Sequence, residues 1–126
     1  MQMILRAATA LSALVLCVLG TAFLITPDLI MGPLGLQADG AIGLNFMRGD
    51  VGASLILIGG LAGRAALAGD GSKLDIPVAW AMLLLAGRIV GMVVDPDGLA
   101  ALPLFAADTG LLLVLMLGRW KMKRAV

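Results

Sequence analysis

The run from Ala7 to Ile25 contains no charged residue, and this feature constrains the fold more than any other in the chain. The hydrocarbon core of a bilayer is about 30 Å thick, and a helix of about 20 predominantly apolar residues crosses it. A helix also satisfies its own backbone hydrogen bonds, which lipid cannot do. We therefore expect residues 6–26 to form a membrane-spanning helix.

The rest of the chain is almost as apolar. Of its 126 residues, 61% are hydrophobic and 13% are charged, with a formal net charge of +1. A soluble domain of this size could not bury so much apolar surface, because small domains keep a high ratio of surface to volume. Lipid is therefore the expected solvent. The near balance of charge gives no reason to expect nucleic acid as a partner.

Missing residue types limit the chemistry of the chain. It has no His, Tyr or Glu, and Cys17 is its single cysteine. One cysteine cannot form an intramolecular disulfide or a cysteine-cluster metal site. The absence of imidazole argues against His-ligated zinc, haem or copper and removes the usual general base. We expect no cofactor and no metal, we assign no catalytic residue, and we interpret Cys17 as an inert buried thiol.

Three further segments have the length of a membrane span once an internal charge is accepted. The links between them contain Pro and Gly at positions typical of turns, and short links make consecutive helices antiparallel neighbours. The sequence thus predicts an all-α membrane protein, an antiparallel four-helix transmembrane bundle that forms one domain over residues 1–126. The four predicted spans are residues 6–26, 42–64, 76–94 and 99–118.

The distribution of Lys and Arg predicts the orientation, because cytoplasmic loops are enriched in these residues. All basic residues outside the spans, together with Arg6 and Arg64 at the ends of two spans, fall on one side of a four-span protein. We therefore expect a multi-pass membrane protein with both termini in the cytoplasm and with Trp120 at the cytoplasmic interface. The basic residues on that side are Arg6, Arg64, Lys73, Arg119, Lys121, Lys123 and Arg124.

The first span also has two features of a signal peptide, a basic start and an apolar run. The run is long for a signal, and no Ala-x-Ala cleavage site stands out, so we expect the segment to be retained. Lipidation of Cys17 is disfavoured, because the bulky Leu16 precedes it where a lipoprotein signal has a small residue.

Four ionisable residues lie inside the predicted spans: Arg48 and Asp50 in the second, Arg88 in the third and Asp108 in the fourth. Charged groups in a membrane normally face the bundle interior and pair with one another. At a rise of about 1.5 Å per residue, all four lie in the outer half of the membrane. We expect one buried, neutral cluster in which Arg88 pairs with Asp108 and Arg48 joins through Asp108, Asp50 or backbone carbonyls. The cluster is either structural or part of a binding site.

Two Gly-x-x-x-Gly motifs, Gly59 with Gly63 and Gly87 with Gly91, favour close helix packing. Small residues at this spacing let the backbones of membrane helices approach. Packing inside the bundle is the preferred interpretation, and a homodimer face is the alternative.

The segments NFMRGDVGASLILIGG and LLLAGRIVGMVVDPDG, followed by an acidic residue in the last span, resemble a known pattern. It is that of an uncharacterised bacterial family of small four-helix membrane proteins, a domain of unknown function that looks distantly similar to DoxX-like proteins. The resemblance covers most of the chain from Pro27 onward. It raises the expectation for Arg48 and Arg88, implies a location in the bacterial inner membrane, and implies no activity.

Three functions remain open on sequence grounds. In the first, the protein is an accessory or assembly subunit of a membrane complex, and its charges specify the fold. In the second, Arg48 and Arg88 bind a lipid headgroup, a quinone-like carbonyl or a small anion. In the third, Asp108 carries protons for a transporter. Membrane lipids and a protein partner or a second copy are the expected partners. The loop that follows the first span is either a lid over the charges or a filler of the interface.

Overall fold

Four helices that are long and apolar enough to cross a membrane make up most of the computed structural model, which describes residues 1–122. No strand occurs within that range. The predicted all-α class, an antiparallel four-helix membrane bundle, is therefore confirmed. The helices are α1 (Gln2–Ile25), a continuous helix made of α3 (Gly40–Phe46), η2 (Met47–Gly52) and α4 (Ala53–Ala68), then α5 (Asp75–Val94) and α6 (Leu102–Lys121).

Each predicted span lies on one of these helices, and most ends differ by a few residues. The first helix ends at Ile25 because Pro27 begins a new element. The third span is longer than predicted, since the short 3-10 helix η3 (Gly71–Leu74) leads directly into α5. Another 3-10 helix, η4 (Gly98–Ala101), leads in the same way into α6.

The connection after α1 is partly helical. It contains α2 (Pro27–Met31) and the 3-10 helix η1 (Gly32–Leu34). Proline suits the first position of α2, because its ring fixes φ near the helical value and its missing N–H would have no partner there. Gly35 then ends the segment with a φ of 69°, which glycine adopts at little cost. The predicted loop therefore includes a short helix that packs against α1.

The second membrane helix changes its winding where its charges occur. Residues Met47–Gly52 form a π-helical segment, which includes Arg48 and Asp50. A π-helical turn accommodates an extra residue and is rare, and it is frequent at functional sites. This segment packs against α1.

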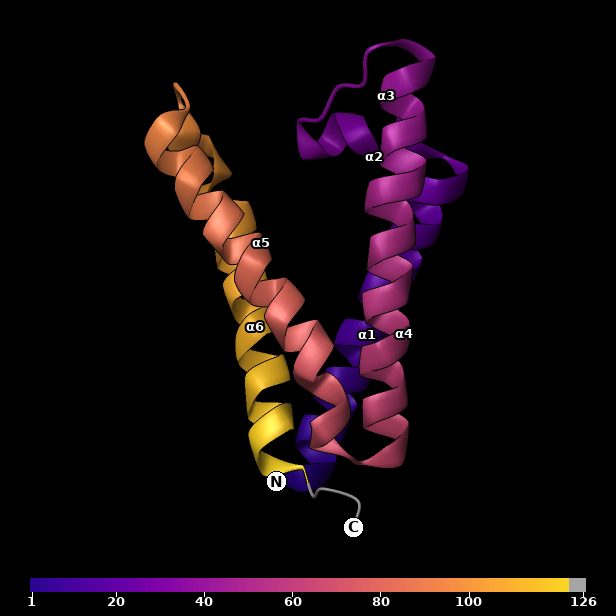
Figure 1. Ribbon diagram of the computed structural model, residues 1–126, viewed down its shortest axis with the longest axis vertical. Helices are drawn as coiled ribbons and strands as arrows, with labels where there is room; N and C mark the ends of the chain where they lie inside the picture. The colour runs from indigo at the N-terminus through magenta and orange to yellow at the C-terminus, as the bar shows by residue number, and fades with distance from the viewer. Residues whose placement is uncertain (123–126) are drawn as a thin grey trace.

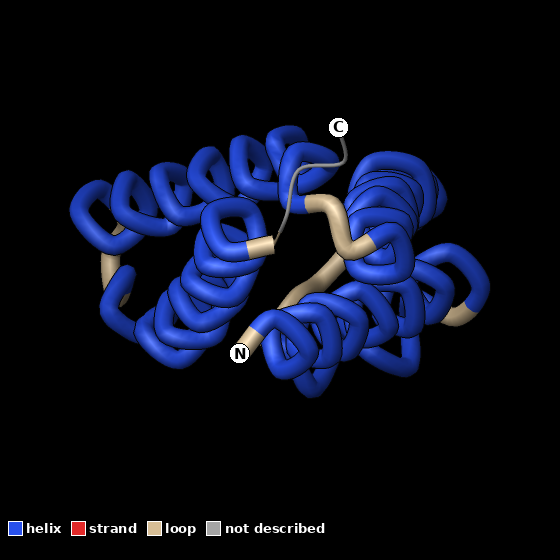
Figure 2. The backbone as a smooth tube through the Cα atoms, turned by 90° about the horizontal axis from the view of Figure 1, so that it is seen from below, coloured by secondary structure: helices blue, strands red, loops and turns tan. Residues whose placement is uncertain are grey.

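The helices form two antiparallel pairs, α1 with the α3–α4 helix and α5 with α6 (Figure 1). The pairs meet at one end, which we call the closed end and which holds the N-terminus, the 69–74 connection and the end of α6 (Figure 1). They diverge toward the opposite end, the open end, which holds α2 and the 95–98 turn. The perpendicular view also shows the pairs diverging (Figure 2). The four helices together have the shape of a V.

Burial follows this shape. The buried core lies near the closed end, where the two helix pairs pack together. In α6 the only buried residues are Leu115 and Gly118, both in its second half. The first half of α6 and most of α5 are left uncovered by the rest of the chain. The core consists of Ala13, Ala62, Ala65, Leu74, Val78, Ala81, Leu115 and Met122.

Candidate functional site

An ion pair between Arg88 of α5 and Asp108 of α6 is the central polar feature of the membrane helices. The Nε of Arg88 donates to Oδ2 of Asp108 at 3.0 Å. The two residues meet because α5 and α6 are antiparallel neighbours joined by a short turn. The pairing expected between these two residues is therefore present.

The pair is only partly covered. The side chain of Arg88 is 34% exposed and that of Asp108 is 17% exposed. Within residues 1–122, the Nε of Arg88 makes the only hydrogen bond of its guanidinium, so Nη1 and Nη2 remain free. A guanidinium with two free N–H₂ groups has the geometry to bind a carboxylate or phosphate.

Each member of the pair faces a different cavity. Arg88 lines an open cavity of about 450 Å³, which we call the Arg88 cavity. Its wall consists of α5, the 95–98 turn and η4, and includes Leu83, Leu84, Gly87, Gly91 and Asp95.

Asp108 lines a cleft of about 340 Å³ between α1 and α6, which we call the α1–α6 groove. Apart from Asp108 and Ser12, the groove has apolar walls. These include Leu11, Val15 and Leu19 on α1 and Leu111 and Val114 on α6.

Arg48 and Asp50 do not belong to this site. They lie in the π-helical segment of the other helix pair, where Arg48 is half-buried and Asp50 is exposed. Neither residue forms an ion pair with another residue in the range 1–122. The expected cluster of four charges is therefore wrong for these two residues. The cause is the divergence of the helix pairs, which separates groups that have similar depths along their helices (Figure 1).

The two Gly-x-x-x-Gly motifs have different environments. A Cβ on Gly59 would lie 2.7 Å from Sγ of Cys17 and 2.9 Å from the backbone oxygen of Ala13, so this glycine allows α1 and α4 to touch. Gly63 lies at the same interface, where a Cβ would meet only the Ala13 side chain at 3.7 Å.

Gly87 and Gly91 are not packed against another helix. A Cβ on Gly87 would have no neighbour within 4 Å, and one on Gly91 would meet only the side chain of Asp95. Their predicted role in packing within the chain is therefore wrong, and both glycines line the Arg88 cavity instead. The contact of α1 with η2 and α4 uses Gly20, where a Cβ would lie 2.7 Å from the backbone oxygen of Gly52 in η2 and 2.8 Å from the backbone nitrogen of Ile56 in α4. Gly20 and Gly52 belong to different segments, so no single motif indicates this contact.

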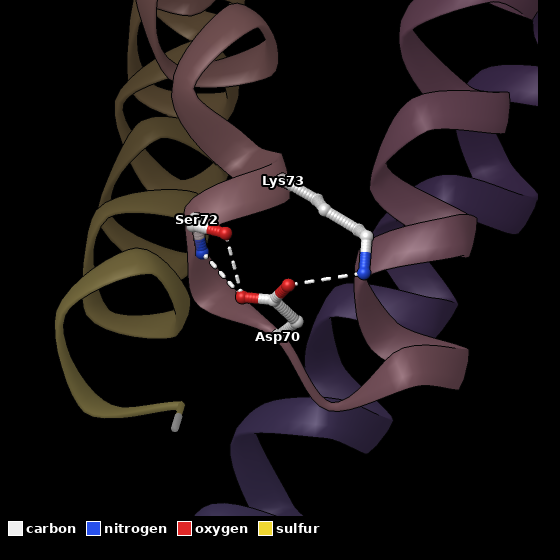
Figure 3. Close-up of polar contacts among 3 residues, drawn as sticks. All are labelled: Asp70, Ser72 and Lys73. Carbon is white, nitrogen blue, oxygen red and sulfur yellow. Dashed lines mark hydrogen bonds and ion pairs between the residues drawn. The ribbon is translucent and has the colours of Figure 1, made fainter. Parts of the chain in front are cut away.

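A second polar group lies at the closed end, in the connection between α4 and α5 (Figure 3). One carboxylate oxygen of Asp70 accepts from the backbone N–H of Ser72 at 3.0 Å and from its hydroxyl at 2.7 Å. The other accepts from Nζ of Lys73 at 3.0 Å. The Ser72 hydroxyl and then the Lys73 ammonium hold the pKa of Asp70 well below its usual range. The arrangement is an N-cap of η3.

Two arginines used to predict the orientation also tie the closed end together. Arg6 donates from Nε to the carbonyl of Ala66 at 3.0 Å and from Nη2 to that of Leu67 at 2.9 Å, which caps the last turn of α4. Arg119 forms an ion pair with Asp75 at the start of α5. Lys123 and Arg124 of the basic tail lie outside the described residues. The sequence pattern indicated the sign of these charges but not their partners.

The fold and the internal ion pair define the class of this molecule: a multi-pass helical membrane protein in which Arg88 and Asp108 form a charge pair within the membrane-spanning part of α5 and α6. Within residues 1–122 no three His, Cys, Asp or Glu side chains are grouped as metal ligands. A scan against protein-family models and searches of curated proteins and of solved structures gave no match. The resemblance to the uncharacterised family of small four-helix membrane proteins, which is distantly similar to DoxX-like proteins, therefore stays a prediction.

Proposed function

We propose that the protein is an accessory or assembly subunit of a complex in the bacterial inner membrane and that it receives a partner helix in the α1–α6 groove. The observation that carries this proposal is the position of Asp108. Its carboxylate lines an otherwise largely apolar groove that the chain itself leaves open.

The energetic argument concerns the charge pair. A charged group in the membrane costs several kcal/mol unless it is paired and shielded from lipid. Arg88 supplies one hydrogen bond to Asp108, and Asp108 lines the groove with its side chain 17% exposed. A partner helix with a small face and a hydroxyl or amide would cover the groove and donate to Asp108. Membrane helices associate by contacts of these kinds.

The groove also offers apolar surface to such a helix. Leu11 and Val15 of α1 are 63% and 49% exposed, although both lie on the side of α1 that faces α6. Exposed apolar residues are ordinary in lipid. Their position beside a carboxylate favours a protein occupant, which can satisfy the carboxylate and match its apolar surroundings together.

Site-specific photocrosslinking in cells tests the proposal. A crosslinking residue at Val15 samples the groove. The matched control is Leu57 of α4, which is 61% exposed and lines neither the groove nor the Arg88 cavity. We expect Val15 to capture one protein in stoichiometric amounts and Leu57 to capture none. Identical products from both positions, or lipid alone from Val15, would contradict the accessory role.

A second candidate function is the binding of an amphiphilic ligand at Arg88. It is favoured by the free Nη1 and Nη2 groups beside an open cavity. Arg48, which we had grouped with Arg88 in such a site, lies on the other helix pair and does not line this cavity.

A further inference from the structure

The Arg88 cavity has a feature that a simple anion site would lack: its wall carries one cation and one anion, Arg88 and Asp95. We propose that this cavity binds a zwitterionic phospholipid headgroup that has a primary ammonium, with the phosphate on Arg88 and the ammonium on Asp95. The inference deepens the second candidate function and does not depend on the accessory role. The two cavities share no lining residue.

Arg88 provides the phosphate end of the site. Its Nε bond to Asp108 fixes the guanidinium and leaves Nη1 and Nη2 without partners among residues 1–122. Arg88 lines an open cavity. Charge-assisted hydrogen bonds from a guanidinium to phosphate oxygens are short and strong, and two donors on adjacent nitrogens can bind two oxygens of one phosphate.

Asp95 provides the ammonium end. A Cβ built on Gly91 would lie 3.3 Å from Oδ2 of Asp95, so the carboxylate leans back over Gly91. Gly91 is three residues from Arg88, close to one helical turn of about 5 Å. The phosphate and ammonium of a phosphoethanolamine group are joined by two carbons, so they can contact two opposite charges on the wall of one cavity. A purely anionic headgroup would instead meet the Asp95 carboxylate as a like charge.

The remaining walls suit a lipid. Gly87 leaves open space beside Arg88, since a Cβ there would have no neighbour within 4 Å. Leu83 and Leu84 line the cavity on the side toward the middle of α5, where an acyl chain would continue.

The depth of Arg88 also agrees with a headgroup contact. The helical segment Gly71–Val94 has 24 residues and a length of about 36 Å at 1.5 Å per residue. It is therefore longer than the hydrocarbon core of about 30 Å. Arg88 is six residues from its end, which leaves the long side chain within reach of the interface.

The test compares three phospholipids with identical acyl chains, bound to the detergent-solubilised protein and measured by native mass spectrometry. They carry ethanolamine, choline or glycerol headgroups. We expect the wild-type protein to bind the ethanolamine lipid roughly tenfold more tightly than the other two, because only this lipid has both the phosphate and an ammonium that donates hydrogen bonds. Equal affinity for all three would overturn the proposal.

Two neighbouring carboxylates give a matched pair of variants. Asp95→Asn should remove the preference for ethanolamine and strengthen binding of the glycerol lipid, since the like charge is gone. Asp97→Asn makes the same charge change two residues away, at a position that does not line the cavity, and Asn tolerates the left-handed backbone found there. It should bind as the wild type does. If both variants change binding equally, the site is not at Asp95.

Variants of two arginines complete the test. Arg88→Ala should weaken all three lipids by roughly tenfold, whereas Arg64→Ala, which removes an exposed charge far from the cavity, should change none of them. If Arg88→Ala does not fold, the preference of Asp95→Asn still decides the question.

A competition experiment with soluble phosphoethanolamine tests whether an acyl chain is bound. If soluble phosphoethanolamine displaces the bound ethanolamine lipid as effectively as the intact lipid does, no acyl chain is bound, and the lipid assignment is overturned. The crosslinks from Val15 should be unaffected in Asp95→Asn, which separates this proposal from the accessory role.

Discussion

At the residue scale, the polar side chains fall into two groups with different tasks. Several at the closed end are held by partners: Arg6 caps α4, and Asp70 is held by both Ser72 and Lys73. The buried hydroxyl of Thr9 has no hydrogen-bond partner within residues 1–122. The pair farther along α5 and α6 is different, because Arg88 keeps free donors and Asp108 faces the α1–α6 groove. Arg88 and Asp108 therefore form an ion pair whose members also line cavities, where a ligand or a partner can contact them.

Asp70 makes a pH-dependent contribution to stability. Since its pKa is lowered in the folded protein, the contribution is fully present above the unfolded pKa of about 3.9 and is lost as the pH falls below it. Asp70→Asn should therefore lower the melting temperature in detergent at pH 7 and should have progressively less effect as the pH falls from 4 toward 2. The control is Asp28→Asn, at an exposed carboxylate on α2, which should show no such pattern. A melting-temperature difference between wild type and Asp70→Asn that stays constant from pH 7 to pH 2 would contradict the prediction.

At the element scale, the role of each Gly-x-x-x-Gly motif depends on which helix lies opposite it. Both Gly-x-x-x-Gly motifs have the same spacing, yet Gly59 lies against α1 and Gly87 lies in open space. The sequence could not distinguish them, because the motif describes one helix face and the outcome depends on the helix opposite. The Arg88–Asp108 pair was predictable, since a short turn forces α5 and α6 together. The separation of Arg48 was not, because it depends on the angle between the two pairs.

Alanine at these two glycines should have opposite effects. Gly59→Ala brings a methyl group against Cys17 and the Ala13 carbonyl, so the α1–α4 contact must open and stability should fall by roughly 1–3 kcal/mol. Gly87→Ala meets no neighbour, and replacing a helical glycine should be neutral or stabilising by up to about 1 kcal/mol. Unfolding in detergent measures both. A loss of stability in Gly87→Ala that grows with protein concentration would instead support the homodimer face considered from the sequence.

At the scale of the whole molecule, the closed end and the open end differ in packing. The core and the polar ties gather at the closed end, the Arg88 cavity lies on α5 toward the open end, and the α1–α6 groove lies between the two helix pairs. A partner in the groove and a lipid in the Arg88 cavity could therefore bind without disturbing the core. This arrangement suits a subunit, because the closed end holds the helices together and the open end offers surfaces to partners.

Orientation decides which side of the membrane these surfaces face. Arg6, Lys73 and Arg119 gather at the closed end, whereas the open-end connections carry Asp and no Lys or Arg. Because Lys and Arg are retained in the cytoplasm during insertion, the closed end and both termini should be cytoplasmic.

Single cysteines introduced in a Cys17→Ala background test this orientation. Leu99→Cys lies beside the 95–98 turn of the open end and Gln2→Cys at the closed end, and both positions are exposed. An impermeant maleimide added to intact spheroplasts should label Leu99→Cys within minutes and Gln2→Cys only after permeabilisation. The reverse pattern would invert the topology and would place the Arg88 cavity among the lipids of the cytoplasmic leaflet. Equal labelling of both positions before permeabilisation would show that the chain inserts in both orientations, against the charge asymmetry of its two ends.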